Sequence, residues 1–108
     1  MNVPSIEHVI AARHYFGLDG GALAAFEVGS PLPSQEAENE FYCPFRISIR
    51  GTTSIRSSYG VDALQALLLA LGYIRAELQV LDEGLGGGLQ WFGGAADDLG
   101  IQIPDVRS

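Results

Sequence analysis

The strongest periodic signal in the chain is a run of large aliphatic residues between Asp62 and Leu81. Leucine or isoleucine recurs every three or four residues, a spacing that aligns side chains along one side of an α-helix. Asp62 is a favourable N-cap, and Gln65 three residues later forms an Asp-x-x-Gln variant of the capping box. Gly84 is expected to end the helix. The sequence therefore predicts one long helix from about Asp62 to Leu81, whose core-facing side holds Leu64, Leu67, Leu68, Leu71, Ile74, Leu78 and Leu81.

The opposite side of this predicted helix is poor in charge, because only Arg75, Glu77 and Gln79 are clearly polar there. A helix that is apolar on nearly all sides is either enclosed by the rest of its domain or lies at an interface. Its apolar run is shorter than the roughly 20 residues that cross a bilayer, so we expect no membrane span. If the protein forms a homodimer, we expect it to use Leu69, Gly72, Tyr73 and Ala76.

A strict alternation of apolar and polar residues from Phe41 to Arg50 predicts a half-buried β-strand. The apolar face consists of Phe41, Cys43, Phe45, Ile47 and Ile49. The other face consists of Tyr42, Pro44, Arg46, Ser48 and Arg50. Because Pro44 has no N–H to donate to a neighbouring strand, this end of the strand is expected at a sheet edge or at a bulge.

Weaker patterns predict further strands on both sides of this one. The predicted segments are strands over residues 6–16, 22–28 and 53–59, turns at 17–21 and 51–52, a surface loop over 30–40 and a short last strand over 89–92. Strands followed by one long helix predict an α+β fold, in which an antiparallel sheet of about four to five strands packs against the helix. We expect residues 1–108 to form a single domain.

The balance of charge argues against several classes of partner. The 108 residues include 13 acidic and 6 basic residues, for a formal net charge of −7, and every basic residue is an arginine. Nucleic acids and anionic membranes are bound by clustered positive charge, so neither is expected as a partner. Cys43 is the only cysteine, and the first residues lack the basic start and apolar core of a secretory signal. We therefore expect a cytoplasmic protein.

Two segments of the chain resemble a family of small bacterial domains of unknown function. They are Tyr42-Cys43-Pro44-Phe45-Arg46-Ile47 and Gly60-Val61-Asp62-Ala63-Leu64-Gln65-Ala66-Leu67-Leu68-Leu69-Ala70-Leu71. The resemblance is strongest over residues 41–81 and weaker at the turn over 29–33 and the closing segment over 98–101. It implies a compact bacterial domain in which the strand and the helix are the shared framework. It implies no activity, because the family has no established catalytic or ligand-binding residues.

No catalytic or metal-binding pattern stands out in the sequence. His8 and His14 share one side of a predicted strand but lie about 20 Å apart, too far for a single metal ion. Cys43 belongs to the apolar face and Arg46 to the other, so we expect a buried thiol instead of an activated thiolate. The glycines over 84–88 follow a helix, whereas a phosphate-binding loop precedes one. We therefore expect no enzyme, no cofactor and no metal.

Acidic residues are the remaining candidate site. Glu36, Glu38 and Glu40 alternate in the predicted loop, and Asp97 and Asp98 are adjacent near the C-terminus. Most such charge is simply solvated surface. Acidic patches can also attract a basic partner and speed its association.

The leading hypothesis is a small, non-catalytic protein-binding module. Its concrete form is an immunity or antitoxin-like inhibitor whose acidic loops cover a basic toxin. One alternative is a self-associating structural domain. Another is a small-ligand-binding protein, which would require a pocket between helix and sheet that contains Arg46, His8 or His14.

Overall fold

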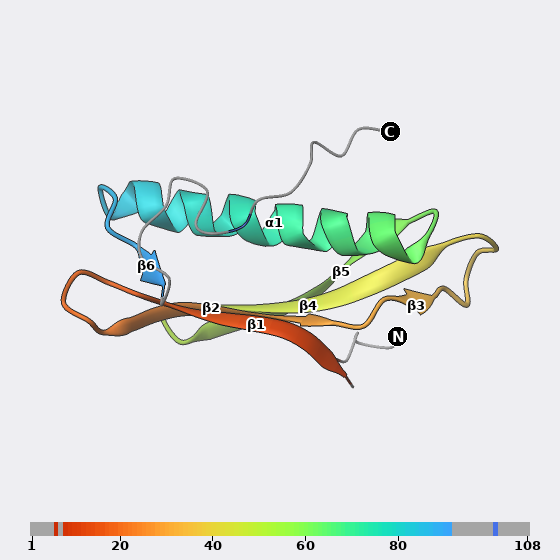
Figure 1. The fold of residues 1–108 in the computed structure, drawn as a ribbon, viewed down its shortest axis with the longest axis horizontal. Coiled ribbons are helices and arrows are strands. Elements are labelled where there is room, and N and C mark those ends of the chain that lie inside the picture. Colours follow the sequence, from red (N-terminus) through yellow and green to blue (C-terminus); the bar gives the residue numbers. More distant parts are fainter. Residues whose placement is uncertain (1–5, 7, 92–100, 102–108) are drawn as a thin grey trace.

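One long helix lies across one face of an antiparallel sheet in the computed structural model, which describes residue 6, residues 8–91 and residue 101 (Figure 1). The elements are β1 (Val9–Phe16), β2 (Ala22–Gly29), β3 (Leu32–Pro33), β4 (Phe41–Ile49), β5 (Thr52–Gly60), α1 (Ala63–Gly84) and β6 (Gln90–Trp91). The predicted α+β fold is confirmed. The sheet has six strands because two short ones, β3 and β6, join the four long ones.

Strand β4 is the centre of the sheet. β2 pairs with one of its edges, and β5 pairs with the other along the full length of β4. β1 pairs with the far side of β2, and β6 covers only Tyr15 and Phe16 of β1. Among the described residues, the edges of the sheet are therefore β5 on one side and most of β1 on the other.

Pro44 does not place β4 at an edge, contrary to the prediction from its missing N–H. It lies in the gap between the residues of β4 that pair with β2 and those that pair with β3. On its other side Pro44 pairs with Ser57 in a regular register, without a bulge. The missing donor is accommodated because the neighbouring strand is interrupted at this point.

The predicted loop over 30–40 contains the short strand β3, which pairs with the start of β4. Directly beyond this pairing, the Ser34 N–H donates to the carbonyl oxygen of Glu40 at 2.7 Å. Two paired residues are too few to produce the alternation from which strands are predicted. The surface loop is consequently shorter than expected and covers residues 34–40.

A two-residue turn at Arg50 and Gly51 connects β4 to β5. Their φ angles are 51° and 84°, and two positive values are typical of a type I′ turn. The twist of this turn matches that of the strands in a hairpin. The turn predicted at Gly51-Thr52 is therefore displaced by one residue, and β5 begins at Thr52.

Residues next to α1 in the chain define where this helix begins and ends. Asp62 is the N-cap, as predicted, and its Oδ1 accepts from the N–H of Gln65 at 2.7 Å. The side-chain oxygen of Gln65 accepts in turn from the N–H of Val61 at 2.8 Å. The helix ends at Gly84, the residue that the sequence predicts as its stop, and Gly86 with a φ of 73° follows soon after. The left-handed glycine just outside the helix marks its end.

The helix packs on the sheet through small residues as much as through leucine. Its buried residues are Ala66, Ala70, Ile74 and Leu78. Leu67, Leu71 and Leu81 are partly buried against them, as predicted. Leu64 is 63% exposed, so the predicted stripe is wrong at this position, and Leu68 is half-buried. Alanine occupies the buried positions at the start of the helix because little room is left there above the sheet.

The core lies between this helix face and one face of the sheet. Phe45 and Ile47 of β4 are buried in it, as the alternation of β4 predicts. The sheet and its flanking segments also contribute Tyr15, Ala24, Phe26, Val28, Cys43, Leu89 and Ile101. On the helix, the ring of Tyr73 stacks on that of Phe45 with centroids 6.2 Å apart. Side chains of the described residues therefore pack closely between α1 and this face of the sheet.

By length and apolar composition alone, α1 would reach across a bilayer. The expectation that its apolar run is too short for this is not supported by those two criteria. Core helices of soluble proteins meet the same criteria. One side of α1 packs on β4 and β5 and contributes buried residues to the core of the domain.

Two contacts hold the start of α1 against β5. The buried Ser58 hydroxyl donates to the carbonyl oxygen of Ala66 at 2.5 Å. Gly60 lies so close to the helix that a Cβ atom added there would be 2.6 Å from the backbone nitrogen of Ala66. A side chain at residue 60 would therefore separate β5 from the helix.

We expect Gly60→Ala to lower the free energy of unfolding by about 1–3 kcal/mol, because the first turn of α1 would have to move away from β5. Urea unfolding followed by circular dichroism measures this change. Gly84→Ala is the matched control, since a Cβ atom there meets nothing within 4 Å. The control should be at least as stable as the parent, because alanine favours a helix. Equal stability of the two variants would contradict the tight contact at Gly60.

Candidate functional site

The face of the sheet opposite α1 carries no helix or strand among the described residues (Figure 1). Side chains alternate along each strand, so every second residue of the four long strands points away from the helix. Antiparallel sheets often have one packed and one solvated face. We call this side the open face, and its residues include Ala12, His14, Ala25, Glu27, Tyr42, Pro44, Arg46, Ser48, Thr53, Ile55, Ser57 and Tyr59.

A hollow of about 460 Å³ lies on the open face, across all four long strands. It is lined by Ala12, His14, Ala25, Phe26, Glu27, Arg46, Ser48 and Thr53. The strand registers place Ala25 beside His14 and Ser48 in one row, and Ala12 beside Glu27 in the next. The hollow exists because these two alanines have short side chains between longer polar ones.

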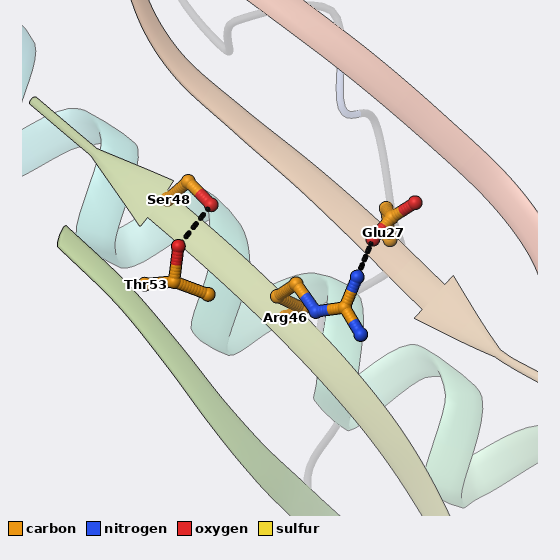
Figure 2. A network of polar contacts seen from close by, with 4 residues as sticks. All are labelled: Glu27, Arg46, Ser48 and Thr53. Atoms are coloured by element: carbon orange, nitrogen blue, oxygen red, sulfur yellow. Dashed lines mark hydrogen bonds and ion pairs between the residues drawn. The ribbon is translucent and has the colours of Figure 1, made fainter. Parts of the chain in front are cut away.

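Two pairs of polar side chains border the hollow (Figure 2). Nη1 of Arg46 donates to Oε1 of Glu27, which joins β4 to β2 by an ion pair. The hydroxyls of Ser48 and Thr53 share a hydrogen bond of 2.9 Å between β4 and β5. Arg46 and Glu27 are 36% and 35% exposed, and a guanidinium group has five N–H donors. Arg46 can thus keep its ion pair and still donate to a bound oxygen atom.

The hollow brings together two of the three residues that sequence analysis assigned to a ligand pocket. Arg46 and His14 both line it, whereas His8 does not. This hollow lies on the open face, whereas the sequence predicted a pocket between helix and sheet, and a pocket there stays a prediction. Core side chains of the described residues pack between the sheet and α1.

A second feature of the open face is a row of large side chains at the end of the sheet that carries β3. Leu32 pairs with Tyr42, and Tyr42 pairs with Tyr59, so the three residues lie side by side across β3, β4 and β5. The tyrosine rings are 6.4 Å apart at an angle of 39°. Tyr59 is 53% exposed and Leu32 is 39% exposed. We call these three residues the aromatic row.

The acidic loop, residues 34–40, lies immediately beyond the aromatic row, because it connects β3 to β4. Glu36 and Glu38 are exposed and Glu40 is half-buried. The two ion pairs found among the described residues, Arg46–Glu27 and Arg56–Glu77, involve none of these three glutamates. The structure thus joins the predicted acidic residues of this loop to an exposed apolar surface. Asp97 and Asp98 lie outside the described residues.

The predicted self-association residues lie on α1 and differ in exposure. Leu69 and Gly72 are half-buried, Tyr73 is 52% exposed and Ala76 is exposed. Val80, one turn beyond Ala76, is exposed as well. This part of the helix surface is apolar and accessible, and its role in self-association stays a prediction.

Cys43 is fully buried, which confirms its predicted placement in the core. Its Sγ donates to the carbonyl oxygen of Gly29 at 3.4 Å, and burial raises the pKa of the Cys43 thiol to about 11. A thiol with a raised pKa is a poor nucleophile at neutral pH. In the part of the chain that the structure describes, no group of three or more histidine, cysteine or acidic side chains is arranged to hold a metal ion.

Sequence analysis missed most of the open-face site. The alternation of β4 correctly placed Tyr42, Arg46 and Ser48 on the face away from the core. Their neighbours Glu27 and Tyr59 come from other strands, and only the strand registers bring them together. A pattern search in one strand contains no signal for such a cross-strand row.

A model of a protein family described as a domain of unknown function, DUF6968, matches residues 12–103. No curated protein and no solved structure matches the chain. The family match includes β2, β4, β5 and α1 in full. The residues of the open face from His14 to Tyr59 are therefore part of the matched region.

We expect the Cys43 thiol of the folded protein to react with Ellman's reagent about a hundredfold more slowly at pH 8 than the unfolded chain does. The folded pKa of about 11 leaves far less thiolate than the ordinary value of 9.0. Absorbance at 412 nm, with and without ~8 M urea, measures both rates. Equal rates would show that the thiol is accessible in the folded protein.

The same pKa predicts how stability depends on pH. The folded protein holds the proton of the Cys43 thiol more tightly than the unfolded chain does. The resulting contribution to the free energy of unfolding is fully present below pH 9.0 and is lost as the pH rises towards 11. Cys43→Ala removes this titrating group. The difference in unfolding free energy between parent and variant should therefore shrink from pH 8 to pH 11, and a constant difference would contradict the raised pKa.

Proposed function

The chain belongs to the DUF6968 family, a domain family of unknown function, and we propose that it is a non-catalytic protein-binding module with a basic partner. The observation that supports this most directly is the aromatic row beside the acidic loop. An exposed apolar centre with charge at its rim is the usual composition of a protein interface.

The aromatic row would provide the centre of the interface. Tyrosine is common among the residues that contribute most to binding energy, because it buries a large rigid surface and keeps a polar hydroxyl at its tip. Tyr59 is more than half exposed, and Val61, two residues further along the chain, is 69% exposed. Such exposed apolar side chains on neighbouring strands are more than the single scattered ones normal on protein surfaces.

The acidic loop would select the sign of the partner's charge. Glu36, Glu38 and Glu40 project from one connection at the edge of the aromatic row, in a chain with a net charge of −7. Complementary charge around an interface mainly speeds association and excludes partners of the same sign. A partner with a basic surface is therefore favoured over an acidic one.

The concrete form of the proposal is an immunity or antitoxin-like inhibitor of a basic toxin in the cytoplasm of a bacterium. Its support is the acidity of the chain, which has 13 acidic and 6 basic residues.

The hollow on the open face favours a second candidate function, which is binding of a small molecule. The polar groups of the hollow surround Ala12 and Ala25. Arg46 offers N–H donors, Ser48 and Thr53 offer hydroxyls, and Glu27 offers an acceptor. This set of groups would suit a small carboxylic acid that also carries hydroxyl groups. The hollow is within the volume range of known ligand sites, although it opens broadly to solvent.

We expect the protein encoded beside this chain in its genome to be basic and to bind it through the aromatic row. Tyr59→Ala should weaken binding about tenfold or more, because it removes a central contact. Glu38→Gln should slow association at low salt and have little effect at high salt. Titration calorimetry measures the first change and stopped-flow fluorescence the second.

Glu83→Gln is the matched control for this test, since it removes one exposed negative charge at the other end of the molecule. Its association rate should stay close to that of the parent. If the neighbouring protein does not bind, or if Tyr59→Ala binds as tightly as the parent, the proposal is wrong. Rescue of growth when both proteins are co-expressed would identify the partner as a toxin.

For the small-ligand alternative we expect gluconate to shift the amide signals of β2 and β4 in an NMR titration. Arg46→Gln should abolish these shifts, because it removes the positive donor from the hollow. Arg50→Gln is the control, since Arg50 lies in the exposed turn away from the hollow. Unchanged spectra at high millimolar gluconate would exclude this class of ligand.

A further inference from the structure

Strand β5 forms a long and regular edge of the sheet. It pairs with β4 over nine residues without a register shift, and its other edge has no strand partner among the described residues. Natural edge strands are usually blunted by proline, lysine, charge or bulges. β5 contains no proline and one charged residue, Arg56, whose side chain is paired with Glu77 of α1 at 2.8 Å. β1, the other edge, has register shifts at both ends.

The accessible apolar side of α1 lies above this same edge. α1 packs mainly over β4 and β5, and Glu77 marks the side of the helix that faces β5. Tyr73 and Val80 are four and three residues from Glu77, so they lie on that side of the helix. Both are more than half exposed. The β5 edge and this helix side form one continuous surface.

We propose that this surface binds a second copy of the chain, so that two β5 strands pair antiparallel and the two sheets become one. Both helices would then lie on the same face of the joined sheet. Neighbouring strands are about 4.8 Å apart, so a helix centred over β4 and β5 would lie about 5 Å from the two-fold axis. Two such helices would be about 10 Å apart, a normal distance for packed helices.

The sequence of β5 is compatible with pairing to itself. In a two-fold antiparallel pair, the axis passes between one residue and its equivalent in the second copy. A register centred on Arg56 would place two like charges opposite each other, so Ile55 or Ser57, on the open face, is a better centre. In either register Arg56 lies opposite a serine of the second copy, not opposite its own equivalent. The buried Ser57 hydroxyl has no hydrogen-bond partner among the described residues, and the register centred on it would bring a second hydroxyl close.

The charge distribution favours a second copy over the other occupants. The acidic loop lies beyond the β3 end of the sheet, and antiparallel pairing sends the two loops of a dimer to opposite ends. They would be separated by more than the Debye length of about 8 Å at physiological salt. The surface itself contains one ion-paired arginine and no acidic residue outside that pair, so it neither attracts a basic partner nor complements an anionic membrane. This inference does not depend on the proposed basic partner.

Sedimentation equilibrium of the full chain tests the inference. We expect the apparent mass to rise from 11.5 kDa towards twice that value at high micromolar concentration. Val80→Glu should weaken the dimer about tenfold or more, because it places a charge between the two helices. Leu64→Glu is the matched control, since Leu64 is 63% exposed on the same helix but away from the β5 side, and it should leave the dimer unchanged.

A cysteine test locates the two-fold axis. Directly opposite residues have Cα atoms about 4.5–5.5 Å apart, which suits a disulfide. We expect either Ile55→Cys or Ser57→Cys to form a cross-linked dimer under mild oxidation, whereas the parent with its buried Cys43 should not. A parent that stays monomeric at every concentration overturns the inference. So does a dimer that is insensitive to Val80→Glu and is cross-linked by neither cysteine.

Discussion

The close packing of α1 on the sheet is the contact on which the other features depend. Ala66 and Ala70 bring the helix down onto β4 and β5, and Gly60 lets its first turn touch β5. This contact decides which face of the sheet becomes the core. The polar residues of β4, of which Arg46 is an example, are thereby directed to the opposite face. α1 covers one face of the sheet, and no helix or strand of the described residues covers the other.

The open face is organised by small side chains as well as by large ones. Ala12 and Ala25 leave the hollow empty between the rows that carry His14 and the Arg46–Glu27 pair. At the other end of the same face, large side chains stand together in the aromatic row. The open face thus contains both the polar hollow and the apolar aromatic row, and the acidic loop lies beside the aromatic row. The two candidate functions use different parts of it and do not exclude each other.

The features that sequence analysis predicted correctly depend on residues close together in the chain. The alternation of β4 and the Asp62 cap of α1 are local patterns, and the structure confirms both. The predicted leucine stripe includes Leu64, which is exposed. The periodicity of a helix shows which of its sides are apolar. Because α1 is apolar over most of its circumference, this pattern does not show which side is buried. The close packing of α1 on the sheet decides that. The sequence did not predict the short strand β3, because two residues are too few to show an alternation of apolar and polar side chains.

By itself, the sequence determined the class of fold, the central strand with its two faces, the long helix and the negative charge of the loop before β4. These follow from backbone geometry, since side-chain direction repeats every two residues in a strand and every 3.6 in a helix. Only the tertiary structure decided which residues share the open face. Arg46 meets Glu27, and Tyr42 meets Tyr59, through strand registers that join segments 17 to 19 residues apart. Register is chosen by the packing of the whole sheet under the helix, and a local pattern carries no information about it.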